Sequence, residues 1–324
     1  MLSVRDDRLR ELVRENVVWI LLAIVFGGFS LLIPIFDSVN NIQALLYGSA
    51  ALGAVVMAES VCLLSGHFDL SVGSITGFSA ITTGVILAQW FPGTPGIVGI
   101  AIILAIGGTI GLLNGVSVAY VGVNPFLQTL SFLIIFSGAI EVVSTATMIN
   151  LPDLYMFVGG GKVFGTIPFA VVLMAVIIVC LHLFLVYTPT GRAIYAVGSN
   201  KQAAEEAGID VQKVVLGVYV FSGVMSGLGG LLYTGYIGAA SPTIGGHTLF
   251  PAFAASIIGG ISLFGGRGKV TNAVGGILLL ATIQVGLVLL NMDPTVVKVV
   301  NGTILLGAIL LYTAQKKRTD VSGD

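Results

Sequence analysis

Three carboxylates stand inside strongly apolar stretches of this sequence: Glu59, Asp69 and Glu141. An ionisable side chain in such surroundings is costly to bury, and where one occurs it often carries a proton or an ion across a membrane. The three acids therefore allow one chemical interpretation, a relay for protons or sodium ions in an ion-coupled transporter or channel. What they can do depends on the elements that position them.

Asp69 lies in the stretch GHFDLSVGS, between two apolar runs. Its carboxylate can cap the free N–H groups of a helix that begins near Leu70, where the helix dipole also favours a negative charge. Ser71 or Ser74 could share that work, and His67 could pair with the carboxylate. In the alternative, the helix is broken and Asp69 lies deeper, facing a pathway and accepting hydrogen bonds from a substrate. The cap is favoured, since an unpaired acid in lipid costs so much.

The elements around these groups are membrane spans. Of the 324 residues, 56% are hydrophobic and 9% are charged, whereas soluble domains carry about 25% charged residues. Several apolar runs approach or exceed the ~20 residues that a helix needs to cross a bilayer. The sequence predicts an all-α polytopic membrane protein with about ten transmembrane helices. The predicted spans are 17–36, 42–64, 70–90, 97–120, 126–146, 167–187, 214–236, 248–263, 271–290 and 295–313, of which the eighth is short for a full crossing.

The basic residues predict the sidedness. With the N-terminus inside and ten crossings, all of the 14 basic residues except Lys162 and Lys298 fall on the inner side, as the positive-inside rule requires. Both termini are then cytoplasmic. The predicted parts are an amphipathic N-terminal segment (1–16), a single transmembrane domain (17–313) with one long cytoplasmic loop (188–213), and a cytoplasmic tail (314–324).

The 44 glycines include two series at helical spacing. Gly107, Gly111 and Gly115 form one series, and Gly223 and Gly227 form the other. Small residues at this spacing let two helix backbones approach closely within a membrane. We therefore expect both series to lie in tight helix contacts.

No motif in the sequence supports catalysis. Two glycine clusters, VGGGKV at 158–163 and FGGRGKV at 264–270, lack the leading glycine and the Ser or Thr of a phosphate-binding loop. The sequence has no His and Cys cluster with metal-ligand spacing and no convergent catalytic set. We therefore expect no enzyme activity, no metal and no cofactor in this chain. If it does energetic work, another chain supplies the energy.

The loop at 188–213 contains a short predicted helix. Ser199 and Gln202 have the spacing of a capping box, in which each side chain satisfies the other's free backbone donor. The helix then runs from about Asn200 to Ala207, and Gly208 supplies a left-handed stop.

The faces of this helix differ in character. Ala203, Ala204 and Ala207 form a small smooth ridge, and Glu205 and Glu206 lead away from it. An ordinary surface helix would look the same. On a protein without an ATPase of its own, however, such a helix could dock into a cleft of a partner protein.

The same loop carries a recognisable pattern. QAAEEAG at 202–208 resembles the E-A-A-x-x-x-G loop of ABC importer permeases, with Gln202 where that loop has glutamate. The longer stretch GRAIYAVGSNKQAAEEAGI is similar to the ribose/xylose/galactose-type sugar permeases. Further stretches that match this family are DLSVGS at 69–74, NGVSVAYVGVNPFLQTL at 114–130 and ASIIGGISLFGGRGKV at 255–270. The related branched-chain amino-acid permeases typically carry Asn where Asp69 stands, so Asp69 favours the sugar branch.

The resemblance implies a permease subunit of an ATP-driven importer in a prokaryotic inner membrane, with the broken-helix fold of that class. A second permease subunit, identical or paralogous, would complete a central path. Two ATPase subunits, which bind the ATP and Mg, would dock on the cytoplasmic side. A sugar-binding protein would deliver a pentose or hexose from the other side.

Because sugars are neutral, the resemblance implies a path lined by hydroxyl and amide partners. The candidates for this path are Asp69, Ser71, Asn114, Asn124, Thr129, Ser131 and Ser137, each of which could instead satisfy local backbone groups. The residues expected to couple the chain to the ATPases are Arg192, Asn200, Gln202, Ala203, Ala204, Glu205, Ala207 and Gly208.

Overall fold

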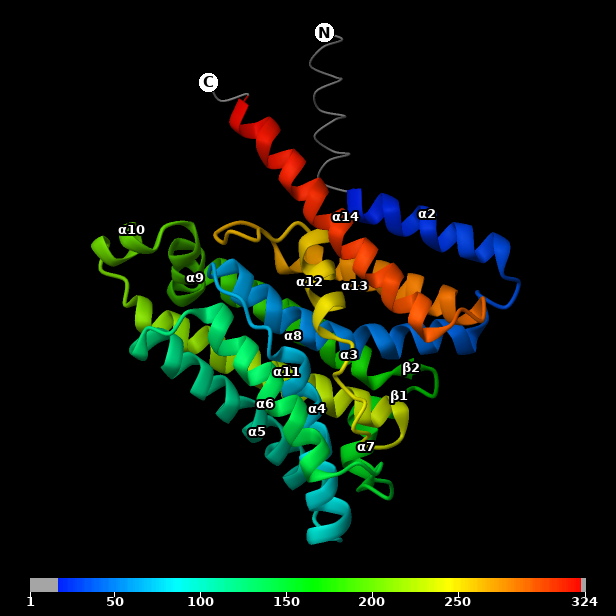
Figure 1. Cartoon of the computed structure of the whole chain (residues 1–324). Coiled ribbons are helices and arrows are strands. Elements are labelled where there is room, and N and C mark those ends of the chain that lie inside the picture. The colour runs from blue at the N-terminus through cyan, green and yellow to red at the C-terminus, as the bar shows by residue number, and fades with distance from the viewer. Residues whose placement is uncertain (1–16, 322–324) are drawn as a thin grey trace.

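The computed structural model describes residues 17–321, and most of them are helical (Figure 1). The long or apolar helices are α2 (Val17–Leu32), α3 (Val39–Leu64), α4 (Val72–Val85), α5 (Gly96–Val116), α6 (Pro125–Val143), α8 (Phe169–Tyr187), α11 (Val211–Ile237), α12 (Leu249–Ile258), α13 (Val270–Leu289) and α14 (Pro294–Val321). The π-helical turns η1 (Ile86–Trp90) and η2 (Ser117–Val121) extend α4 and α5. The remaining elements are the short helices α7 (Asp153–Gly160), α9 (Pro189–Ser199) and α10 (Lys201–Glu206) and the antiparallel pair β1 (Lys162–Val163) and β2 (Ile167–Pro168).

Each of the ten predicted spans contains one helix. Within the described residues, seven helices are long and apolar enough to cross a membrane, counting α4 with η1 and α5 with η2. The other three, α2, α12 and residues 295–307 of α14, are apolar but shorter. The predicted shortness of the eighth span is confirmed: α12 has 10 residues and rises about 15 Å, half the thickness of the hydrocarbon core. The predicted N-terminal segment, 1–16, lies outside the described residues.

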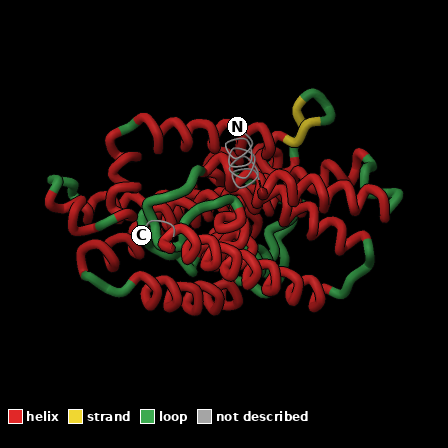
Figure 2. Tube along the Cα trace, turned by 90° about the horizontal axis from the view of Figure 1, so that it is seen from above, coloured by secondary structure: helices red, strands yellow, loops and turns green. Residues whose placement is uncertain are grey.

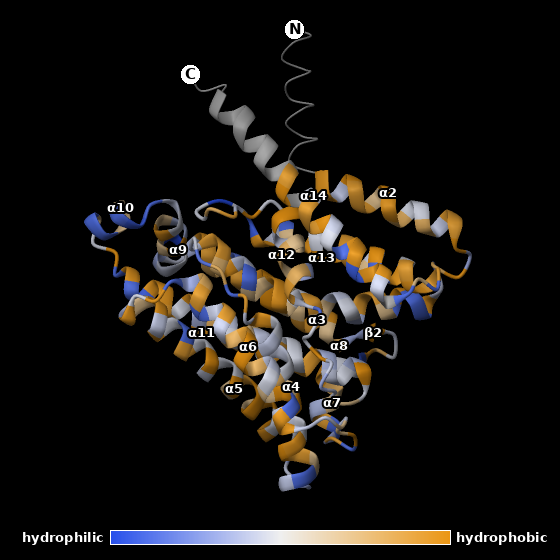
Figure 3. Cartoon of the chain, viewed as in Figure 1, coloured by the Kyte–Doolittle hydropathy of each residue, from blue (hydrophilic) through white to orange (hydrophobic). Residues whose placement is uncertain are grey.

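Seen from above, the molecule is elongated, with loops at its two ends and in its centre (Figure 2). The core consists of α3, α4 and α11, because 89%, 72% and 72% of their apolar segments are buried, against 11% for α6. Apolar residues cover much of the outer helix surface, whereas α10 is hydrophilic (Figure 3). This distribution suits a chain whose outer helices face lipid or another apolar surface.

Both glycine series lie in tight helix contacts, as predicted. They bring α5 and α11 together with almost no side chain between them. A Cβ atom added to Gly223 would lie 2.8 Å from the Cα of Gly111, and one added to Gly227 would lie 2.7 Å from the carbonyl oxygen of Ile103. Because neither space could hold a methyl group, only glycine allows this approach.

The loops predicted for the inner side lie together at one end of the molecule. The Gly266 amide donates to the Leu64 carbonyl at 2.9 Å, and a Cβ on Gly198 would lie 2.7 Å from the Gly266 nitrogen. A Cβ on Gly265 would in turn lie 2.8 Å from the Cα of Gly66. We call these four glycines, at 66, 198, 265 and 266, the glycine junction. In it, three segments far apart in sequence touch backbone to backbone.

Loops predicted for the outer side also meet one another. Met148 and Ala240 form an isolated antiparallel bridge, and the Lys162 ammonium donates to the Gln43 side chain at 2.8 Å. These contacts join segments that were predicted on the same side, and the number of crossings stays a prediction. Which end faces the cytoplasm stays a prediction from the basic residues.

Candidate functional site

The loop predicted to carry a docking helix forms two helices, α9 and α10, joined at Asn200. Thr188 caps α9 by accepting the Gly191 amide at 3.0 Å. Asn200 caps α10, since its side-chain oxygen accepts the Ala203 amide at 3.1 Å. The predicted capping box is wrong because Ser199 is the last residue of α9 and its hydroxyl donates to the Tyr195 carbonyl. The extended backbone that a cap needs occurs one residue later, at Asn200.

The stop of α10 is as predicted. Gly208 has φ +82°, and its amide donates to the Glu205 carbonyl at 2.9 Å. The prediction that Ala203, Ala204 and Ala207 form one exposed ridge is wrong in one respect: Ala204 is buried, while Ala203 and Ala207 are exposed. Neighbouring residues on a helix point about 100° apart, so positions 203 and 204 do not share a face.

The outward surface of the α9–α10 arm is polar. Its exposed residues include Arg192, Ser199, Asn200, Lys201, Gln202, Ala203, Glu205, Glu206, Ala207 and Gly208. The chain leaves the arm through Asp210, whose side chain accepts the Lys213 amide at 3.1 Å and caps α11. A hydrogen bond from the Lys213 side chain lowers the pKa of Asp210, so the cap is charged at neutral pH.

Asp69 is fully buried in the segment that joins α3 to α4. One carboxylate oxygen accepts the Ser71 amide at 3.0 Å and also the Ser71 hydroxyl, and the other accepts the Ser222 hydroxyl at 2.7 Å. The Asn114 amide donates to the Ser71 hydroxyl at 2.9 Å, and Gln128 donates to Asn114 at 3.4 Å. The network thus joins the start of α4 to α5, α6 and α11.

This geometry gives Asp69 a structural role close to the predicted cap. The carboxylate accepts the amide just before α4, which begins at Val72 rather than near Leu70. His67 does not pair with Asp69: its Nδ1 lies 2.8 Å from the Ser65 carbonyl oxygen, and burial lowers the pKa of the imidazole. The Glu59 carboxylate is also buried and has no hydrogen-bond partner, although the Asp69 amide faces it.

Three other predicted pathway residues satisfy local backbone groups. Asn124 caps α6 by accepting the amides of the second and third residues beyond it. Thr129 and Ser131 donate to the carbonyls four residues earlier at 2.9 and 2.8 Å. Of the seven predicted pathway residues, Ser137 is the one that lines a cavity described below.

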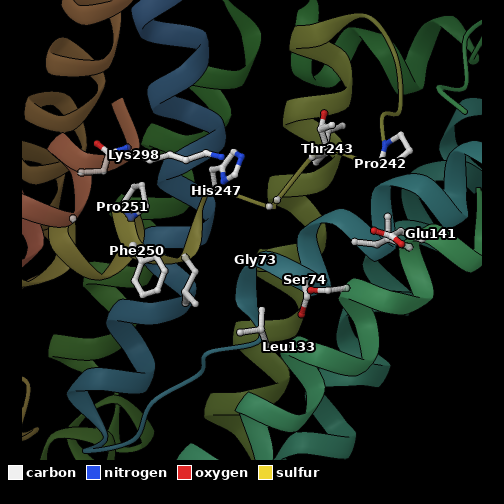
Figure 4. Close-up of a pocket in the computed structure, with 18 residues that line it drawn as sticks. Gly73, Ser74, Leu133, Glu141, Pro242, Thr243, His247, Phe250, Pro251 and Lys298 are labelled. Carbon is white, nitrogen blue, oxygen red and sulfur yellow. The ribbon is translucent and has the colours of Figure 1, made fainter. Parts of the chain in front are cut away.

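A cavity with a volume of about 730 Å³ lies between α4, α6, α12, α14 and the loop before α12 (Figure 4). This volume falls within the about 300–1,000 Å³ typical of small-molecule sites. Its polar lining includes Ser74, Ser137, Glu141, Thr243, His247, Lys298 and Asn301, and its apolar lining includes Leu133 and Phe250. Two smaller cavities beside α8 are lined largely by apolar side chains.

The sequence did not identify His247, Phe250 or Asn301 as site residues. They come from segments that only the fold brings next to α6, and no local spacing marks them. Lys298 carried a signal, since it is one of two basic residues predicted on the outer side. Within residues 17–321, no group of three His, Cys, Asp or Glu side chains could hold a metal ion.

Comparison with known proteins places this arrangement in a family. Residues 41–311 match the family described as the permease component of branched-chain amino-acid transport systems. The D-allose transport system permease protein of Escherichia coli is 34% identical over 90% of this chain and 89% of its own. The L-arabinose transport system permease protein of the same species is 31% identical over 93% and 91%, and its ribose import permease protein is 30% identical over 92% and 93%.

No solved structure matches this chain. The relatives match this chain along nearly their whole length, and the described part of this chain has the apolar helices expected of a multi-pass membrane protein. The chain therefore belongs to the ABC transporter permease family, in its ribose/xylose/galactose-type branch.

Proposed function

We propose that this chain is the membrane subunit of an ATP-driven importer in a prokaryotic inner membrane and forms the pathway for a pentose or hexose. The relatives named for D-allose, L-arabinose and ribose transport support a sugar as the cargo. The exposed α9–α10 arm carries the proposal. It is the polar projection at the end where the predicted cytoplasmic loops meet, and it is built to hold one helix in a fixed orientation.

In this proposal, two ATPase subunits bind the α9–α10 arms of two permease subunits, and they hold the ATP and Mg. A sugar-binding protein docks at the opposite end. The weak contact of α6 with the rest of the chain supports a second permease subunit, because exposed apolar side chains such as Ile134 and Val142 are left uncovered. The chain itself performs no catalysis.

The test is purification of the tagged chain from its own cells, followed by reconstitution in liposomes. We expect an ATPase subunit to purify with it, and the assembled complex with the sugar-binding protein to import a neutral sugar only when ATP is supplied. The chain alone should neither hydrolyse ATP nor import sugar. Uptake by the chain alone, driven by a proton or sodium gradient, would contradict the proposal and favour an ion-coupled transporter that uses Glu59, Asp69 and Glu141.

A further inference from the structure

The cavity between α6 and α12 contains polar groups that the fold leaves free. Among the described residues, the side chains of Ser137, His247 and Asn301 have no hydrogen-bond partner, and all three line the cavity. The Asp69 network differs, because its carboxylate and the hydroxyls around it are already joined to one another. A ligand that can both donate and accept hydrogen bonds would therefore find its partners in the cavity rather than at Asp69.

The cavity also exposes an aromatic ring. Phe250, near the start of α12, is 60% exposed and contributes to the lining. A pyranose or furanose ring has a C–H face that packs on an aromatic ring and hydroxyls that need polar partners, so an aromatic surface opposite free polar groups suits a sugar. Glu141 and Lys298 also line the cavity, and their opposite formal charges leave its lining without a net formal charge from these two residues.

The wall that carries His247 is held firmly in place. A Cβ on Gly73 would lie 2.8 Å from the Gly245 carbonyl oxygen, and the Thr248 hydroxyl donates to that same oxygen at 2.9 Å. The turn before α12 is thus packed directly on the first turn of α4. A wall whose backbone is fixed in this way lowers the ordering cost when a ligand binds, because only side chains remain to be ordered.

The floor of the cavity is joined to Asp69. Ser74 lines the cavity, and its hydroxyl donates to the Ser71 carbonyl at 2.9 Å. Ser71 in turn donates to Asp69. Asp69 therefore holds the floor in position without touching the ligand.

We propose that this cavity is the sugar-binding chamber of the pathway, in which the C–H face of the sugar packs on Phe250 and its hydroxyls bind Ser137, His247 and Asn301. The inference rests on the proposed function, because it takes the cargo to be a neutral sugar. The free neutral groups and the aromatic ring are the features that favour this ligand class.

The first experiment probes the chamber with a thiol reagent. In a Cys180→Ser background, which removes the exposed native cysteine, Ser137→Cys is labelled by a small membrane-impermeant thiol reagent. We expect labelling to slow about tenfold when the complete importer is supplied with the sugar that it transports. Ser131→Cys is the matched control, because it lies on the same helix outside the cavity, and its labelling rate should not respond to the sugar.

The second experiment measures sugar import by Phe250→Leu in the reconstituted importer. We expect uptake at saturating sugar to fall by about tenfold while the permease still assembles with its ATPase, and Phe91→Leu, which changes an exposed phenylalanine outside the cavity, to import normally. If the wild-type importer transports the sugar, and both Phe250→Leu uptake and Ser137→Cys labelling are unaffected, the chamber inference alone is overturned. If the wild-type importer transports a branched-chain amino acid and no sugar, the proposed function is overturned instead.

Discussion

Asp69 is a fully buried acid whose oxygens are both occupied by donors from the protein. Its three hydrogen bonds come from the Ser71 amide, the Ser71 hydroxyl and the Ser222 hydroxyl. A buried donor left without an acceptor costs about 1–3 kcal/mol. The side chain therefore stabilises the chain reversal between α3 and α4, which explains why an acid is present in so apolar a region.

Asp69→Asn should fold, assemble and transport nearly as the wild type does. The asparagine oxygen can still accept from Ser71, and the Ser222 hydroxyl can turn to accept from the new amide. Asp69→Ala should lower the thermal stability of the detergent-purified protein, since it leaves the Ser71 amide and the Ser222 hydroxyl without acceptors. Thermal unfolding and sugar uptake measured on the same preparations check both expectations.

The control for the Asp69→Ala prediction is a double variant that combines Asp69→Ala with Ser222→Ala. Because the two side chains are bonded to each other at 2.7 Å, the destabilisation of Asp69→Ala and Ser222→Ala together should be smaller than the sum of the single effects. Normal stability of Asp69→Asn with uptake below a tenth of wild type would show a role in the pathway itself.

The sequence predicted the kind of role that Asp69 plays but few of its partners. The amide of Ser71 is two residues away, so a local cap could be anticipated. Ser222 is 153 residues away, and Asn114 reaches the network through Ser71. Neither has a spacing that marks it, because only the packing of α5 and α11 brings it there.

At the scale of elements, α10 depends on its two ends. It has 6 residues, too few to persist by its own propensity, so the Asn200 cap and the Gly208 stop hold it. The sequence placed the stop correctly because a glycine directly after a helix most often supplies the left-handed conformation that ends it. It missed the cap because α9 continues through Ser199, and no local signal separates the end of one helix from the start of the next.

Gly208→Val should reduce ATPase binding and transport while membrane insertion stays normal. A β-branched residue at φ +82° costs about 1–3 kcal/mol, so the end of α10 would change its backbone. No atom lies within 4 Å of a Cβ at this position, so the effect comes from the backbone rather than from a clash. Co-purification of the ATPase with the permease measures it.

Gly165→Val is the matched control. Gly165 also has a positive φ, +74°, and an open surrounding, but it lies in the turn between β1 and β2, at the other end of the molecule. The control should bind the ATPase normally. Equal ATPase binding by Gly208→Val and the wild type would exclude the α9–α10 arm as the docking surface.

At the scale of the whole molecule, the spans and the glycine contacts were predictable and the cavity was not. The length of an apolar run and the spacing of Gly107, Gly111 and Gly223 are local properties of the sequence. They can therefore be used without knowing how the helices pack. The cavity is a space between elements that are far apart along the chain. Its volume and its free groups follow from the path of α6 and from the turn before α12, which composition and period do not determine.

Under the proposed function, the glycine junction bears on the ratio of ATP molecules hydrolysed to sugars imported. Side chains between two segments can repack and absorb a displacement, but backbones in direct contact cannot. A movement of α9 must therefore shift the segment that leads to Asp69 and the turn that follows α12 by a similar amount. Because these segments must move together, ATP hydrolysis and sugar import should stay in a fixed ratio.

Gly198→Ala should loosen that ratio. The added methyl group would clash with the Leu64 carbonyl oxygen and with the Gly266 nitrogen, so it would push α9 away from both segments at a cost of about 1–3 kcal/mol. ATP hydrolysis would then continue while fewer sugars enter for each ATP. Gly217→Ala is the control, because its Cβ would meet no atom within 4 Å. Paired measurement of phosphate release and sugar uptake in the same liposomes gives the ratio, and an unchanged value for Gly198→Ala would mean that the stoichiometry is set elsewhere.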